Sequence, residues 1–200
     1  IEARLNHLNP IQRRIFDYAV IIGGKFDFSL LQTATQQTEE SLLAVIDDLI
    51  NAGLLMEPRS LGKPEFMISH DRYTEVAYEA IPAVRRKGMH LQAALTIEQF
   101  YTGQLEPHFT TLADHFNQAR KPEKAAYYAA QAGEQAINHF ASDEALHYLG
   151  LALSLTPKDN STELVRLRLA RETVYDLLGL RNEQEEDLSA LESLCASLPI

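Results

Sequence analysis

The stretch from residue 66 to residue 82 reads Phe-Met-Ile-Ser-His-Asp-Arg-Tyr-Thr-Glu-Val-Ala-Tyr-Glu-Ala-Ile-Pro, and its hydrophobic period changes partway along. Phe66 and Ile68 alternate as in a short, half-buried strand. His70 lies where strand turns to helix, beside the unpaired amides of the helix start, which is a place suited to an anion. The following helix ends at Pro82, and one of its faces carries Tyr73, Val76, Ala77 and Ala80.

The chain before this junction predicts three helices and a hairpin. Asn9-Pro10 is a helix-start signal, and Gly23-Gly24 stops the helix that it begins. Thr38 opens a helix whose apolar side chains recur at helical spacing until Gly53. Three helices followed by a hairpin is the order of a winged helix. The expected helices are 10–22, 29–35 and 38–51, and the expected strands are 54–57 and 65–69, joined by a polar turn at Pro58–Pro64.

From Ala83 onward the pattern predicts only helices, with loops so short that neighbouring helices must be antiparallel. The motif Lys124-Ala125-x-x-Tyr128 recurs twenty residues later as Glu144-Ala145-x-x-Tyr148. Ala145, Leu149, Ala152 and Pro157 match the spacing of the second helix of a tetratricopeptide repeat (TPR). Gly133 lies where the first helix of such a repeat has a small residue. The expected helices are 83–101, 106–119, 122–139, 142–155, 162–178 and 182–197.

The sequence therefore predicts a mainly α fold in two domains. Residues 1–82 form a winged-helix domain with a small β-hairpin. Residues 83–200 form an antiparallel α-helical repeat domain that is TPR-like. Stacked helical hairpins of this kind offer a surface suited to protein partners.

Composition limits the classes of function. The 200 residues are 46% hydrophobic and 23% charged, and the net charge of −10 is shared equally between residues 1–82 and residues 83–200. Binding to a phosphate backbone draws on clustered Lys and Arg, so this balance argues against nucleic acid as the main partner. Cys195 is the single cysteine, which fits a reducing compartment, and no apolar run approaches the ~20 residues of a membrane span. The chain begins at Ile1 without an initiator Met, so we expect an excised fragment.

Several short motifs, taken in order, resemble one family. The motifs are Leu8-Asn9-Pro10 through Gly23 with Phe26 and Phe28, Leu49-x-x-Ala52-Gly53-Leu54-Leu55, Phe66-x-Ile68-x-His70-Asp71 with Ala77-Tyr78, Arg85-Arg86 with His90, Leu112-Ala113-x-His115-Phe116, and Glu123-Lys124-Ala125. Their order and spacing are similar to the winged-helix and helical-repeat region of STAND/AAA-type signalling ATPases, as in LuxR-type transcription activators and in ATPases fused to cyclases or kinases.

The resemblance implies a cytoplasmic signal-transduction module without catalytic residues. Its winged helix would pack on the ATPase core of the same protein, and its repeats would bind protein partners. No phosphate-binding loop Gly-x-x-x-x-Gly-Lys-Ser/Thr occurs, so we expect no enzyme activity and no cofactor in this chain, and ADP or ATP only in the full-length protein. By position, His70 is the residue that would reach bound ADP and hold the closed, inactive state.

Each singled-out residue also has a structural interpretation. His70 could cap its helix and contact nothing else, and the run from Arg85 to Lys87 could be a solvated face. Glu183, Glu185, Glu186 and Asp187 are expected to form an exposed face, and Tyr127, Tyr128 and Tyr148 to pack between helices. No His-x-x-x-His pair occurs, so we expect no metal site.

The alternative function is that of a DNA-binding winged-helix regulator with a helical dimerisation region. Thr38–Asn51 occupies the position of a recognition helix. Its charged residues are all acidic, namely Glu39, Glu40, Asp47 and Asp48, and would repel phosphate. We therefore expect protein partners rather than DNA or a membrane.

Overall fold

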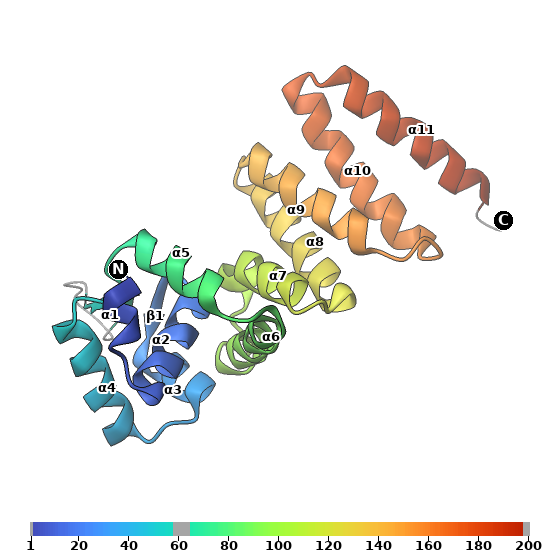
Figure 1. Ribbon diagram of the computed structural model, residues 1–200. Coiled ribbons are helices and arrows are strands. Elements are labelled where there is room, and N and C mark those ends of the chain that lie inside the picture. Colours follow the sequence, from blue (N-terminus) through green and yellow to red (C-terminus); the bar gives the residue numbers. More distant parts are fainter. Residues whose placement is uncertain (1, 58–64, 198–200) are drawn as a thin grey trace. The chain divides into compact units, whose positions relative to one another are not determined.

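The computed structural model describes residues 2–57 and 65–197, and it is mainly helical with a small antiparallel sheet (Figure 1). The chain divides into two compact units, residues 1–102 and residues 103–200, which we call the first unit and the second unit. The predicted turn at Pro58–Pro64 lies outside the described residues. Among the described residues, no helix is long and apolar enough to cross a membrane.

The first unit contains six helices and three strands among its described residues. These elements are α1 (Glu2–Asn6), α2 (Pro10–Ile22), β1 (Lys25–Asp27), α3 (Phe28–Thr35), α4 (Glu39–Asn51), β2 (Leu55–Met56), β3 (Glu65–Ile68), α5 (Asp71–Ala80) and α6 (Ala83–Phe100).

Helix α6 accounts for the difference between the predicted domain boundary at Pro82 and the division of the structure at Thr102. It packs against both α2 and α3, so it belongs to the first unit. The face that it buries consists of Met89, His90, Ala93, Ala94, Thr96 and Ile97. Because these residues are as helical as those that follow, the sequence pattern did not separate α6 from the second unit.

The first strand, β1, was not expected from the sequence. It pairs antiparallel with β3, which also pairs with β2, so the strand order is β1-β3-β2. Phe26 lies opposite Phe66, both are buried, and their ring centroids are 6.4 Å apart. A strand of three residues leaves too short an alternation to recognise without its partner.

The ends of α2 follow local signals. Asn9 Oδ1 accepts hydrogen bonds from the amides of Ile11 and Gln12, both 2.9 Å long, and Gln12 Oε1 accepts one from the Asn9 amide. This capping box satisfies amides that the first helical turn leaves without partners. The helix ends at Gly23, whose φ of 69° favours glycine, so the predicted start and stop are both confirmed.

Helix α5 buries Tyr73 and Ala77 and half-buries Val76, as predicted. Ala80 lies in the helix at helical spacing from Tyr73 and Ala77, as predicted, but it is exposed at the last position of the helix. The backbone of Ile81 is extended and its side chain enters the core there instead.

The second unit is entirely helical in its described part, and each helix packs on the next (Figure 1). Ala145 and Ala152 are fully buried in this unit, and Ala145 packs with Ala136 of α8 and Val174 of α10. Gly133 of α8 is constrained by α9, since a Cβ there would lie 2.7 Å from Leu149 Cγ. Its elements are a 3-10 turn (Glu106–His108), α7 (Phe109–Gln118), α8 (Pro122–Asn138), α9 (Ser142–Leu155), α10 (Ser161–Leu178) and α11 (Arg181–Ser197).

The twenty-residue repeat in the sequence corresponds to a repeated turn. The α7–α8 and α8–α9 turns each contain one residue with positive φ, Arg120 (52°) and Phe140 (59°), which are twenty residues apart. In both turns the amide of the residue that follows donates to the carbonyl five residues earlier, from Lys121 to Phe116 and from Ala141 to Ala136, each at 2.9 Å. The α10–α11 turn has the same hydrogen bond around Gly179, whose φ is 69°. This is the Schellman geometry, which ends a helix and reverses the chain.

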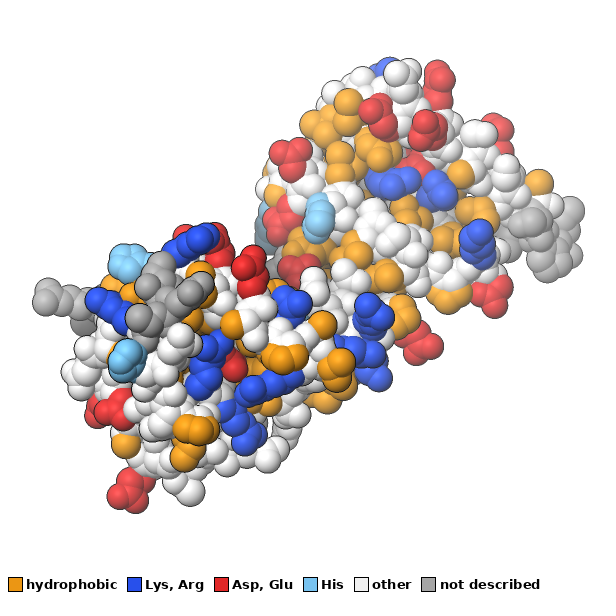
Figure 2. Space-filling view, in the orientation of Figure 1, with side chains coloured by type: hydrophobic (Ala, Val, Ile, Leu, Met, Phe, Trp, Pro, Cys, Tyr) orange, Lys and Arg blue, Asp and Glu red, His pale blue; other side chains and the backbone are white. Residues whose placement is uncertain are grey.

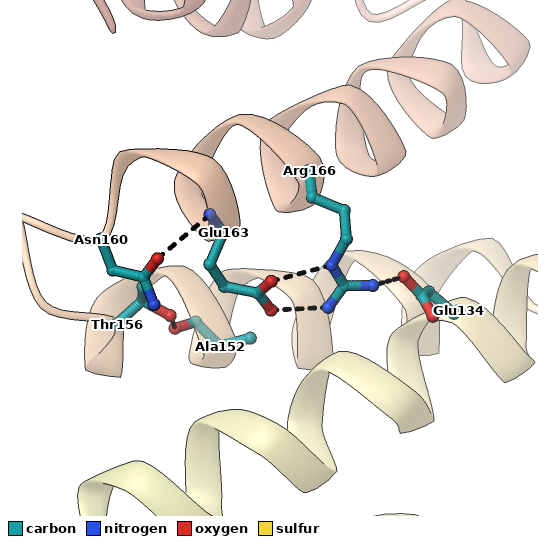
Figure 3. A network of polar contacts seen from close by, with 6 residues as sticks. All are labelled: Glu134, Ala152, Thr156, Asn160, Glu163 and Arg166. Carbon is teal, nitrogen blue, oxygen red and sulfur yellow. Dashed lines mark hydrogen bonds and ion pairs between the residues drawn. The ribbon is translucent and has the colours of Figure 1, made fainter. Parts of the chain in front are cut away.

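The α9–α10 connection is built differently (Figure 3). Asn160 Oδ1 accepts the Glu163 amide at 3.3 Å and so caps α10. Arg166 of α10 holds Glu163 with two hydrogen bonds of 2.6 and 2.9 Å and also contacts Glu134 of α8. This network links the start of α10 to α8.

Candidate functional site

The candidate site is the junction between β3 and α5, where the sequence predicts His70 to act. Ser69 anchors the junction, because its hydroxyl donates to the Gly53 carbonyl at 2.6 Å and its amide donates to the Leu54 carbonyl at 3.0 Å. His70 follows in an extended conformation at the N-cap position of α5. The predicted position of His70 at a strand-to-helix junction is therefore confirmed.

The His70 side chain is exposed and makes no cap hydrogen bond to α5. Its ring lies 6.1 Å from the ring of Tyr73, centroid to centroid, and Tyr73 in turn accepts a hydrogen bond of 2.8 Å from Arg4. The capping interpretation is thus not supported by a bond. The imidazole can be reached from outside the first unit, while a contact with nucleotide stays a prediction.

An open cleft of about 520 Å³ lies beside the junction. Its carboxylates come from α5, where Glu75 pairs with Arg72 at 2.7 Å. His70 is not part of its lining. Because the lining has three acidic side chains and no Lys or Arg, the cleft disfavours phosphate by itself. It is lined by Gly23, Gly24, Met67, Ile68, Asp71, Thr74, Glu75, Tyr78 and Glu79.

Helix α4, which the sequence pattern assigns to the position of a recognition helix, presents an acidic surface. Its four carboxylates, Glu39, Glu40, Asp47 and Asp48, are all exposed. Gln12 Nε2 donates to Asp48 at 2.8 Å, and the range 38–51 contains no Lys or Arg. The apolar stripe of the helix, Leu42, Val45, Ile46 and Leu49, is buried instead.

The basic run from Arg85 to Lys87 is only partly a solvated face. Arg85 lies 3.5 Å from the buried carboxylate of Asp17, which Arg13 also binds at 2.7 Å. Burial raises the pKa of Asp17 and the two guanidinium groups oppose that shift. Arg86 stacks over the Tyr78 ring at 4.8 Å, so two of the three basic residues make internal contacts.

Tyr78 and His90 form a second polar contact inside the first unit. The Tyr78 hydroxyl and His90 Nε2 are 3.0 Å apart, and their rings meet edge to face. Burial lowers the pKa of His90 to about 4, with a further contribution from the nearby Arg86 charge. His90 is therefore neutral at physiological pH and has a structural role.

In the second unit the predicted acidic face needs correction. Asp187 is fully buried, whereas Glu183, Glu185 and Glu186 are exposed. Arg171 binds both Asp187 oxygens at 2.7 Å, and Arg168 also pairs with this carboxylate. The charge of Asp187 serves to attach α11 to α10.

The predicted packing of the tyrosines is confirmed for two of the three. Tyr128 stacks on Phe116 with ring centroids 5.7 Å apart, and Tyr148 donates to Asp114 at 3.2 Å. Burial raises the pKa of both Tyr148 and Asp114. Tyr127 is exposed, so its predicted packing between helices is wrong. In the described part of the chain, no group of three or more His, Cys, Asp or Glu residues could hold a metal ion.

A comparison with protein-family models, curated proteins and solved structures finds no match to this chain.

Proposed function

We propose that this chain is a regulatory and protein-interaction module of a STAND-type signalling ATPase. In this proposal the first unit is a winged helix that packs on a nucleotide-binding core. The second unit is a TPR-like scaffold that binds protein partners. The element order α2-β1-α3-α4-β2-β3 and the repeated helix turns support these two assignments.

The acidity of α4 is the observation that carries the interaction role. A recognition helix approaches phosphates, and Lys and Arg supply most of the affinity for them. The exposed face of α4 has four carboxylates and no cation. This helix therefore favours a protein surface over DNA, and the DNA-binding alternative has no comparable support.

The His70 junction supports the link to nucleotide. A histidine at a helix start can donate to a phosphate oxygen, and the His70 ring is exposed with no cap bond that would turn it inward. The adjacent cleft is acidic, so this chain would not hold a nucleotide alone. His70 would instead contact ADP already bound to the core, and the chain itself would carry no catalytic residue.

A DNA titration separates the interaction module from its rival. Fluorescence anisotropy with a mixed-sequence duplex should detect no sub-micromolar binding between about 50 mM and 200 mM salt. Replacing Glu40 and Asp47 together by Lys removes the repulsion and should create weak, salt-sensitive binding. Sub-micromolar affinity of the unmodified chain for a defined duplex, lost when α4 is altered, would contradict the proposal.

A further inference from the structure

The α8–α9 turn places a large apolar side chain where the backbone favours glycine. Phe140 has a φ of 59°, a left-handed conformation that Gly or Asn adopts more readily. Its side chain is 85% exposed, so no packing in the described structure explains a phenylalanine there. Strained and exposed residues of this kind are candidates for a functional contact.

The end of α10 extends this apolar surface. Val174 packs in one cluster with Ala136 of α8 and Ala145 of α9, next to Ala141. Leu177 and Leu178 follow Val174 by three and four residues, so they lie one turn further along the same side of α10. They are 68% and 45% exposed. Because Ala141, the neighbour of Phe140, packs against the cluster that contains Val174, we group Phe140 with Leu177 and Leu178 and call the three the turn-edge patch. Figure 2 shows apolar side chains on this part of the second unit.

The turn-edge patch has an acidic border. Asp143 and Glu144 lie in the first turn of α9, which follows Phe140 after Ala141, and Glu183 lies in the first turn of α11, just beyond the α10–α11 turn. All three carboxylates are exposed. Asp176, beside Leu177, is a fourth exposed carboxylate in this border, and it pairs with Arg181. Acidic side chains also lie near the apolar ones in Figure 2.

We propose that the turn-edge patch docks a basic segment of a partner protein. The segment would present a leucine or an aromatic side chain to Phe140 and Leu177, between lysines or arginines that meet the acidic border. Aromatic anchors supply much of the affinity at interfaces, and complementary charge selects the partner. The proposal deepens the interaction role proposed above and rests on it, because it assigns that role to one edge of the second unit.

The test uses the whole chain and two defined probes. One is an amphipathic peptide of leucine and lysine about fourteen residues long, and the other has glutamate in place of every lysine. Titration calorimetry at low salt should detect binding of the Leu–Lys peptide and none of the Leu–Glu peptide. Added salt should weaken the binding, because the acidic border contributes to it.

Matched substitutions locate the binding site. Phe140→Asn removes the anchor and suits the left-handed backbone, so the thermal midpoint should stay unchanged or rise. We expect the Kd for the Leu–Lys peptide to rise by about tenfold or more, as for loss of a central aromatic contact. Arg120→Asn is the control, since Arg120 has the equivalent backbone conformation in the α7–α8 turn. This control should bind as the unmodified chain does.

Two outcomes would overturn the proposal. Equal affinity of the Phe140→Asn and Arg120→Asn variants would mean that the peptide binds the acidic chain without using the turn-edge patch. Concentration-dependent self-association without peptide, abolished by Phe140→Asn, would show that a second copy covers the patch. Either outcome is distinct from failure of the proposed function, which DNA binding by α4 would reveal.

Discussion

Replacing Asp187 by Ala should destabilise the second unit by about 3 kcal/mol, which is the cost of leaving buried charges without their partner. The Asp187 side chain is almost fully buried, and Arg168 and Arg171 both bind it from α10. This carboxylate raises the pKa of Arg171 through its hydrogen bonds. Only Asp187 and Leu191 are buried in the described part of α11, so the attachment of this helix depends strongly on the ion pairs.

Urea unfolding followed by circular dichroism measures the effect. Hydrogen exchange should show the loss first in α11, because this helix has little other buried surface. Glu186→Ala is the matched control, since Glu186 is the exposed neighbour, and it should change stability by less than about 0.5 kcal/mol. A similarly small change for Asp187→Ala would contradict the structural role assigned to the ion pairs.

Acidification should destabilise the first unit through His90. The pKa of His90 falls from 6.5 to about 4 on folding, so between these pH values His90 is protonated in the unfolded chain and neutral in the folded chain. The contribution of neutral His90 to the free energy of unfolding is fully present above pH 6.5 and is lost as the pH falls from 6.5 towards 4. We expect His90 to account for about 2 kcal/mol of this loss, after allowing for partial solvent access.

His90→Gln isolates this contribution, because glutamine can keep a hydrogen bond to Tyr78 and does not titrate. Urea midpoints at pH 7.5 and pH 4.5 should differ less for the variant than for the unmodified chain. The pKa of Asp17 is raised on folding, so protonation of Asp17 at low pH favours the folded state. This effect opposes that of His90, and it contributes equally to the pH dependence of both proteins. Identical pH dependence in the two proteins would exclude His90 as the sensitive group.

Local signals in the sequence predicted the helices of the second unit well. The expected helix 142–155 is found as Ser142–Leu155, because short loops and a steady apolar period define it. Strand β1 could not be predicted in this way, since its pairing with β3 joins residues forty positions apart. The boundary after α6 was likewise hidden, because it depends on which neighbour a helix packs against.

The site was predictable in position but not in environment. The change of period after Ser69 places His70 at the junction, whereas the absence of a cap hydrogen bond depends on how the His70 side chain turns. Asp187 was assigned to an exposed face because acidic residues surround it. Its spacing of four from Leu191 was the signal that it shares the buried side of α11.

The ADP content of the ATPase that we propose to contain this chain tests the central claim most directly. A charge-assisted hydrogen bond contributes about 1.5–3 kcal/mol, so His70→Ala should lower ADP retention by roughly tenfold. Arg72→Ala is the control, because Arg72 is an exposed neighbour on α5 that pairs with Glu75. The account predicts that ADP co-purifies with the unmodified protein and the Arg72→Ala variant and is depleted in His70→Ala. Equal ADP in all three proteins, or none in the unmodified one, would contradict a nucleotide-sensing role for this junction.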